Sequence, residues 1–331
     1  MKARAPNGLP DRVKLRSCER PEARGGRILD VFDRRATKGR DANARFHDGR
    51  QTVQRSRLLL CCAVVASAGL GCRQSATERP PGPIVSALFA LAAEFGADAE
   101  ATTRAFASLQ DIALRVEKRH ARSHADVADD INAVIFGELG FAREIDSAAT
   151  RFFQLSSVIS ERRGSCLGLG ALYLAIGERI GVPLDGVLLP GHFFVCTRDP
   201  GRHNVELLRR GEAMPDDWYR RKYGPWPEVG SAYFRPVTVT ELVAVHWYNR
   251  GNDLRAAGDL VAAEAAYART AREFPGFAEA HASLGAVQQL RGAFAEAAAS
   301  YREAARAWPD LPGLAGNVEL LKRQLAAASA P

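Results

Sequence analysis

Three side chains in the middle of the chain could together perform nucleophilic chemistry: the thiol of Cys166, the imidazole of His192 and the carboxylate of Glu206. A thiol attacks a carbonyl carbon as its thiolate, an imidazole moves the proton, and a third polar group orients the imidazole. Whether these side chains can meet depends on the helix and the strands that we expect to carry them.

Cys166 is expected in the first turn of a helix. Gly164 and Ser165 form a turn and a candidate N-cap, and Gly181 followed by Pro183 ends the helical pattern. Free N–H groups and the positive end of the helix dipole favour a thiolate at a helix start. The apolar residues that recur at helical spacing are Leu169, Leu172, Tyr173, Ile176 and Ile180.

His192 and Glu206 are expected on neighbouring strands. The β-like runs GVLLPGHFFVC and HNVELL are separated by the turn residues Asp199-Pro200-Gly201. If the pairing register is even, His192, Asn204 and Glu206 share one face of the hairpin. Asn204 is the alternative orienting group, since an amide can also hold an imidazole. Beyond Gly211 we expect an aromatic, irregular stretch that packs against the hairpin.

Each candidate also has a purely structural interpretation. Cys166 could be a small buried apolar residue, and His192 could be a core histidine bonded to the backbone. Glu206 could be a surface acid paired with Arg209 or Arg210. The cysteines and histidines lack the spacing of zinc ligands, so we expect no metal and no other cofactor.

The basic charge of the chain is concentrated at its start. The whole chain carries a net charge of +7, and residues 1–52, with 14 Lys and Arg against 7 Asp and Glu, account for all of it. Two further arginines precede residue 58, which leaves −2 for residues 58–331. The globular part therefore gives no support to nucleic-acid binding. We expect residues 1–52 to be disordered, or to be an untranslated leader with Val53 as the true start.

Residues 53–72 have the form of a lipoprotein-type signal peptide. Two arginines precede an uncharged apolar run at 58–71, which is too short to span a bilayer comfortably. The ending Gly69-Leu70-Gly71-Cys72 is similar to a lipobox, with Gly where Leu is more typical, and predicts lipidation of Cys72. We therefore expect an exported lipoprotein, anchored in the membrane on the periplasmic side of a bacterial cell envelope. The alternative is a long leader before a short membrane anchor.

The remainder divides into a Pro-rich linker at 73–83, a domain at 84–236 and a repeat region at 237–331. The domain reads as helices up to residue 160. The repeat region opens on a possible capping box formed by Thr238 and Glu241.

The repeat region shows a period of 34 residues. The pairs that carry this period are Gly251/Gly285, Gly258/Gly292, Ala263/Ala297, Tyr267/Tyr301 and Pro275/Pro309. The period predicts two tetratricopeptide repeats, at about 244–277 and 278–311, and a capping helix at 313–327. Such repeats bind a protein or peptide partner in their concave face.

The middle of the chain resembles a known family. INAVIFGELGF and VISERRGSCLGLGALYLAIGERIGVPLDGVLLPGHFFV are similar to the bacterial transglutaminase-like domain of the Sir-B-one type, which often occurs with tetratricopeptide repeats. The resemblance covers roughly 95–225, and PGHF is its most specific feature. It implies an α+β fold in which a helical N-terminal part and a papain/transglutaminase-like core precede an all-α tetratricopeptide-repeat solenoid. It also implies a Cys-His-acid triad with Cys166, His192 and Glu206 at the matching positions, where the usual Asp-Pro-Phe run reads Glu-Leu-Leu.

Two functions of different classes follow. The first is an exported transglutaminase-like cysteine hydrolase or acyltransferase that acts on amide bonds through a Cys-His-Glu triad and binds partners through its repeats. Its thioester intermediate would go to water or to an amine. The second is a catalytically inactive scaffold lipoprotein that mediates protein–protein interaction through the repeats. Thiol reactivity distinguishes them, because only the enzyme needs an activated Cys166.

Overall fold

The computed structural model describes residues 75–76, 79–123, 125–144, 149–198, 203–228 and 230–328. The predicted leader at 1–52, the signal peptide at 53–72 and the lipidation site Cys72 lie outside these ranges. Within the ranges, no helix combines the length and the apolar character that a membrane span requires.

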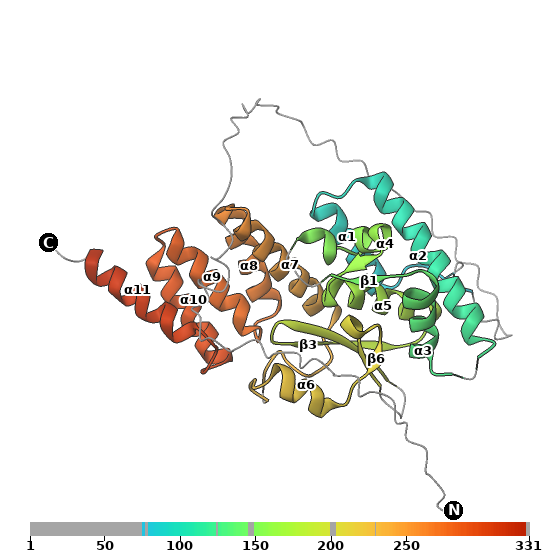
Figure 1. Cartoon of the computed structure of the whole chain (residues 1–331). Helices are drawn as coiled ribbons and strands as arrows, with labels where there is room; N and C mark the ends of the chain where they lie inside the picture. Colours follow the sequence, from blue (N-terminus) through green and yellow to red (C-terminus); the bar gives the residue numbers. More distant parts are fainter. Residues whose placement is uncertain are drawn as a thin grey trace, which may run out of the picture.

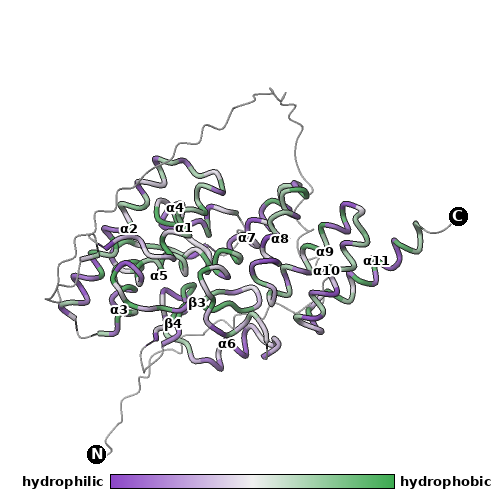
Figure 2. Tube along the Cα trace, turned by 180° about the vertical axis from the view of Figure 1, so that it is seen from behind, coloured by the Kyte–Doolittle hydropathy of each residue, from purple (hydrophilic) through white to green (hydrophobic). Residues whose placement is uncertain are grey.

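The N-terminal half is a group of helices packed around one buried helix, α5 (Figure 1). Twelve of the fifteen residues of α5 are buried, so this helix is apolar on every side. Helix α2 is amphipathic, and its trace alternates between hydrophilic and hydrophobic residues in Figure 2. The elements are α1 (Pro83–Glu94), α2 (Ala99–His120), α3 (Val127–Asn132), the π-helical turn η2 (Ala133–Glu138), β1 (Ala142–Arg143), η3 (Thr150–Phe152), α4 (Leu155–Glu161), β2 (Arg163–Gly164) and α5 (Cys166–Ile180).

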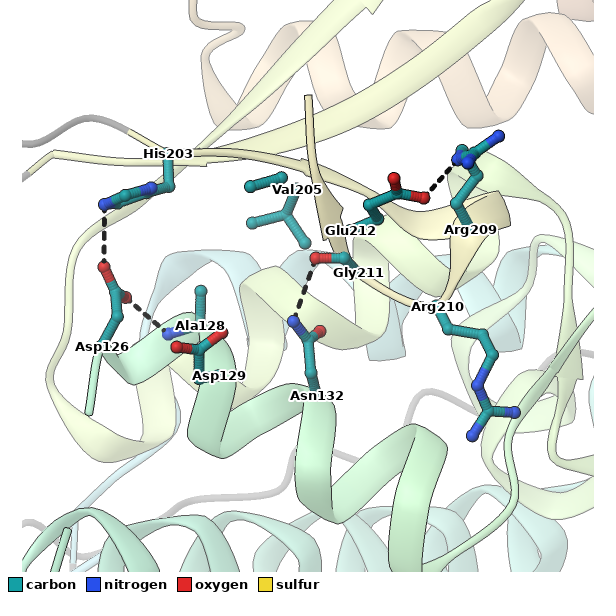
Figure 3. A pocket seen from close by; sticks show the side chains of 11 residues that line it. Asp126, Ala128, Asp129, Asn132, His203, Val205, Arg209, Arg210, Gly211 and Glu212 are labelled. Atoms are coloured by element: carbon teal, nitrogen blue, oxygen red, sulfur yellow. Dashed lines mark hydrogen bonds and ion pairs between the residues drawn. The ribbon is translucent and has the colours of Figure 1, made fainter. Parts of the chain in front are cut away.

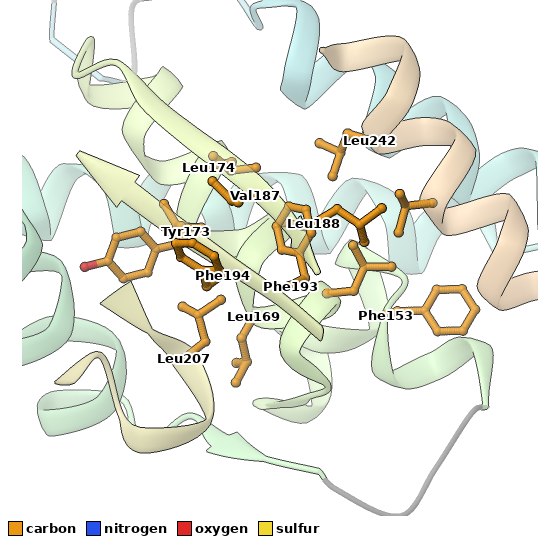
Figure 4. Close-up of a cluster of buried hydrophobic side chains, with 14 of the residues drawn as sticks. Phe153, Leu169, Tyr173, Leu174, Val187, Leu188, Phe193, Phe194, Leu207 and Leu242 are labelled. Atoms are coloured by element: carbon orange, nitrogen blue, oxygen red, sulfur yellow. The ribbon is translucent and has the colours of Figure 1, made fainter. Parts of the chain in front are cut away.

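Four antiparallel strands follow in chain order and form one sheet. They are β3 (Leu184–Leu189), β4 (His192–Thr197), β5 (Asn204–Glu206) and β6 (Glu212–Ala213), with the 3-10 turn η4 (Leu207–Arg209) between the last two. Helix α5 covers one face of the sheet, where a side chain at Gly170 would collide with the ring of Phe193. Figure 4 shows Phe193 within this cluster of buried apolar side chains.

Helix α6 (Asp216–Tyr223) covers the other face of the sheet (Figure 1). Its Tyr219 stacks on Phe194 of β4 with ring centroids 4.1 Å apart. We expected this stretch to be irregular, and it begins instead with a helix. Acidic residues in the first turn and basic residues in the last turn complement the helix dipole and explain the difference.

The C-terminal region is helical, as predicted, and extends from one side of the core (Figure 1). Thr238 and Glu241 form the predicted capping box at its start. Its helices are α7 (Val239–Ala256), α8 (Leu260–Glu273), α9 (Ala278–Leu290), α10 (Phe294–Ala307) and α11 (Leu314–Ala328). Gly251 packs against the ring of Tyr267, and the same contact recurs 34 residues later between Gly285 and Tyr301.

The first of these helices, α7, is fastened to the N-terminal helices. Asp253 of α7 accepts a hydrogen bond from the N–H of Thr150 at 3.1 Å, and Arg250 donates to the hydroxyl of Thr150 at 2.9 Å. The indole of Trp247 meets the ring of Phe95 edge-on, with centroids 4.9 Å apart. These contacts fix the position of α7 relative to the core.

The described part of the predicted linker is docked on the domain rather than free. The buried guanidinium of Arg179, near the end of α5, donates to the carbonyl groups of Ala76 and Arg79. The neighbouring Glu178 accepts hydrogen bonds at 2.8 Å from two N–H groups in the first turn of α1. The segment that leads into α1 is therefore held at the C-terminal end of α5.

Candidate active site

Cys166 is the first residue of α5, where the sequence predicted it. Ser165 caps the helix, and its hydroxyl accepts a hydrogen bond from the N–H of Gly168 at 3.3 Å. The N–H groups of Cys166 and Leu167 belong to the first turn, for which the helix itself provides no acceptor. They are available to an oxygen atom that sits beside the thiol.

His192 is the first residue of β4, directly after the tight turn at Pro190-Gly191. Its ring is buried, and Nε2 lies 2.8 Å from Oε2 of Glu206. The thiol of Cys166 interacts with the same ring closely enough to raise the pKa of the imidazole. Tyr223 of α6 stacks flat on the imidazole, with ring centroids 4.3 Å apart and planes 1° from parallel.

Glu206 is fully buried at the end of β5. Its second carboxylate oxygen accepts a hydrogen bond from the N–H of Leu208 at 3.1 Å. The alternative of a surface acid paired with an arginine does not hold. Arg209 pairs with Glu212 instead, and Arg210 donates to the carbonyl of Phe136.

Asn204 shares the face of Glu206 but does not serve the imidazole. The pairs Val195–Val205 and Cys196–Asn204 give the even register that we expected. The amide of Asn204 donates to the carbonyl of Met214 at 3.1 Å and to Asp216 at 2.6 Å. Asn204 therefore braces the start of α6, and the structure brings together Cys166, His192 and Glu206 without it.

Two opposing effects set the charge of His192. Burial lowers its pKa, but hydrogen bonds and Coulombic attraction from Cys166 and Glu206 outweigh burial and raise the pKa to about 9. Burial, with the negative charges of Glu206 and Cys166, raises the pKa of the stacked Tyr223, so its hydroxyl stays neutral. The site thus favours an imidazolium ion between a thiol and a carboxylate.

A cavity of about 340 Å³ opens beside the thiol and the imidazole. Its walls come from two distant parts of the chain. The core contributes Ser165, Cys166, Leu167, Leu188, Leu189, Gly191, His192 and Phe193, and the C-terminal helices contribute Val245, Tyr248, Asn249, Asn252, Phe277 and Glu279. We did not predict the second wall from the sequence, because the 34-residue period assigns those residues to repeats without indicating which helix face meets the core.

A second cavity, also of about 340 Å³, lies between the start of α3 and the β5–β6 hairpin (Figure 3). Several of its polar groups already have partners: His203 lies 3.3 Å from Asp126, and Asn132 donates to the carbonyl of Gly211 at 3.1 Å. This cavity contains no candidate nucleophile. Across the part of the chain that the structure describes, no group of three or more His, Cys, Asp and Glu is arranged to hold a metal ion.

The part of the chain that carries the site is similar to known proteins. Residues 103–244 match a family model described as Transglutaminase-like superfamily, and the match contains Cys166, His192 and Glu206. Two proteins of Xylella fastidiosa, from strains 9a5c and Temecula1 / ATCC 700964, are both named UPF0162 protein. Each is 35% identical over 97 residues, which is 29% of this chain and 34% of the relative. The chain thus spans about a third of the length of the curated relatives it matches.

Among solved structures, the chain is similar to menin, in a crystal structure that reveals the binding site for the Mixed Lineage Leukemia (MLL) protein. The TM-score is 0.39, with 14% identity, over 68% of this chain and 65% of that one. A likeness at this level carries no argument about function.

Proposed function

We propose that the transglutaminase-like domain of this chain is a cysteine hydrolase or acyltransferase that acts on amide bonds. The observation that carries the proposal is the buried hydrogen bond between His192 and Glu206 beside Cys166 at the start of α5. A carboxylate buried at this point holds the imidazole in one orientation and stabilises its charged form. A core histidine bonded to the backbone needs no such acid.

The reaction proceeds by acyl transfer through a thioester. The thiolate of Cys166 attacks the amide carbonyl carbon, a C–S bond forms, and the N–H groups of Cys166 and Leu167 hold the oxyanion. The imidazolium of His192 gives its proton to the amide nitrogen, the C–N bond breaks and the amine leaves. Water or a second amine then attacks the thioester and passes a proton to the neutral imidazole, and the thiolate leaves.

The raised pKa of His192 suits this sequence of proton transfers. With a value of about 9 the imidazole is charged at neutral pH, so the acid that the leaving amine requires is present before substrate binds. Glu206 stays in place throughout, because the N–H of Leu208 fixes its second oxygen.

We further propose that the domain is of the bacterial Sir-B-one type and that α7–α11 are tetratricopeptide repeats that bind a protein or peptide partner. The PGHF segment, which runs from a turn into β4, and the 34-residue recurrence of the Gly–Tyr contact support these assignments. Three exposed large apolar side chains, Val261, Leu290 and Leu325, all lie on these helices. Export and lipidation at Cys72 complete the proposal and are supported by the signal-like sequence at 53–72.

The rate of alkylation of Cys166 by iodoacetamide at different pH values tests the proposed chemistry. It is followed in the full chain by mass spectrometry of the peptide that contains Cys166. We expect fast alkylation well below ~8.5, where free cysteines ionise, and a return to ordinary behaviour in His192→Ala. The matched control is His246→Ala, which removes another buried histidine and leaves the rate unchanged. An inert thiol, or equal rates with and without His192, would refute the enzyme and favour the scaffold.

A further inference from the structure

The cavity beside Cys166 is closed on one side by α7 and by the start of α9. We propose that Glu279, in this wall, binds a primary ammonium group of the substrate. The inference rests on the proposed function, because it names the substrate class of the same site. It also gives the C-terminal helices a direct part in substrate selection.

The described lining of the cavity has an acid on this side and no basic side chain to pair with it. Apart from Cys166 and His192, which pair with each other, Glu279 is the one acid among the described lining residues, and these include no Lys or Arg. The hydroxyl of Tyr233 donates to one carboxylate oxygen of Glu279. A hydroxyl does not neutralise a carboxylate, so the group that best complements Glu279 in this half-buried position is a cation from outside.

The surrounding structure holds Glu279 in place. Tyr233 is itself buried, and its ring packs against Trp308 with centroids 5.5 Å apart. Phe277, two residues before Glu279, packs against Tyr248 at 4.7 Å. The carboxylate therefore sits on a rigid aromatic support rather than on a mobile surface chain. Burial raises its pKa to about 8, so the acid is mostly neutral at pH 7, and an ammonium group beside it would favour the charged carboxylate.

The remaining lining residues indicate the kind of group that carries the ammonium. Leu188, Leu189, Val245 and Phe277 offer apolar surface in the same cavity as Glu279 and the thiol. A volume of about 340 Å³ is at the small end of ligand pockets, which suits one amino-acid-sized group rather than a long peptide. The ammonium is thus either the α-amine of the acyl donor or the amine of an acyl acceptor.

A structural role for Glu279 would be to complement the dipole of α9, in whose first turn it lies. Glu296 provides a matched comparison. It lies in the first turn of the neighbouring helix α10, is exposed and does not line the cavity. Removing either charge affects a helix N-terminus, whereas only the Glu279 change affects the cavity.

Binding to the full chain with Cys166→Ser tests the proposal. Leucinamide, N-acetylleucinamide and isopentylamine are titrated by calorimetry. We expect leucinamide to bind at least about tenfold more tightly than its acetylated form, the size of one charged hydrogen bond. Glu279→Gln should abolish this preference, Glu296→Gln should leave it intact, and Glu279→Asp should restore part of it. If isopentylamine binds and its binding depends on Glu279, the ammonium belongs to an acyl acceptor. If isopentylamine does not bind while leucinamide does, the ammonium belongs to the acyl donor.

Equal binding of leucinamide and its acetylated form, no binding of leucinamide, or a preference that persists in Glu279→Gln would overturn the inference. Tyr233→Phe provides a second variant that keeps the carboxylate but loses its support, and we expect it to weaken the preference. Cys166 alkylation in the chain that keeps Glu279 separates the two proposals. A reactive thiol without ammonium preference refutes this inference alone, and an inert thiol with the preference intact refutes the catalytic proposal alone.

Discussion

Two histidines are buried to nearly the same extent in different regions, yet their pKa values move in opposite directions. His192, at the start of β4, is 3% exposed, and His246, in α7, is 1% exposed. Burial lowers the pKa of His246 to about 4 despite the carbonyl groups of Leu242 and Phe153 beside it. The charged partners of His192 outweigh burial and raise its pKa to about 9. Burial disfavours the charged form of both rings, and the groups next to each ring decide whether it is charged.

The two environments also differ in what surrounds the ring. Nδ1 of His246 contacts the carbonyl of Leu242, one turn earlier in the same helix, at 2.8 Å, and the ring meets Phe153 at 6.2 Å. His246 therefore fills the contact between α7 and the core. His192 instead joins a carboxylate, a thiol and a cavity. The comparison separates a histidine that packs from one that is prepared to transfer protons.

The largest expected contrast comes from the same substitution at both sites. His192→Leu leaves the carboxylate of Glu206 buried without its partner, which should lower the free energy of unfolding by about 3–5 kcal/mol. His246→Leu leaves no buried charge alone, because the Leu242 carbonyl keeps its helical position, and should change stability by about 1 kcal/mol or less. Urea unfolding of both variants measures the difference. Equal costs would show that Glu206 does not stabilise the folded state through His192.

Acidification should reveal the opposite signs of the two shifts. The pKa of His246 is about 4 in the folded chain against ~6.5 when unfolded, so the unfolded state binds more protons between these values. Stability due to His246 is present above pH 6.5 and is lost as the pH falls through 4, by at most about 3 kcal/mol. We call this fall in the free energy of unfolding at low pH the acid limb. His246→Gln should reduce it, and urea unfolding at a series of pH values measures the change.

His192→Gln is the control for the acid limb. The raised pKa of His192 makes its contribution fully present below pH 6.5, and that contribution is lost only as the pH rises through about 9. The acid limb should therefore persist in His192→Gln. If the acid limb disappeared in His192→Gln, its assignment to His246 would be wrong.

The smallest effect concerns the ring that lies on His192. Tyr223→Leu removes a stacked partner at 4.3 Å, a contact worth about 0.5–1.5 kcal/mol, and should slow alkylation of Cys166 a few-fold as the imidazole gains freedom. Tyr223→Phe keeps the ring and should behave as the unmodified chain does. If both variants slow the reaction equally, the hydroxyl rather than the stacked ring positions His192.

Local sequence signals predicted the elements of the site, and long-range contacts determined the rest. The N-cap at Ser165 placed Cys166 correctly at a helix start, and strand alternation put Glu206 on the same face as His192. Strand alternation places Asn204 and Glu206 on the same face as His192, so it could not show which of the two contacts the imidazole. In the structure Asn204 turns toward Asp216 instead. The packing of Tyr223 on His192 depends on residues 31 positions apart, which no periodicity records.

The fold shows the same division. The helix start at Thr238 follows from a pattern of four residues, and the structure confirms it. The cavity wall that contains Glu279 depends instead on how α7 rests against α1 and η3, through contacts such as that between Asp253 and Thr150. Such contacts join residues about a hundred positions apart, so the helices could be predicted from the sequence but their arrangement could not.

The length of α5 sets the distance between the docked segment before α1 and the thiol of Cys166. Ala76 is held by Arg179 at one end of α5, and Cys166 occupies the other end, fifteen residues or about 22 Å away. The four residue steps from Cys72 to Ala76 can span at most about 14 Å. A lipid on Cys72 would therefore confine the thiol to a shell within roughly 40 Å of the bilayer, allowing for side-chain reach. Such an enzyme would modify what stands close to its own membrane and leave distant targets untouched.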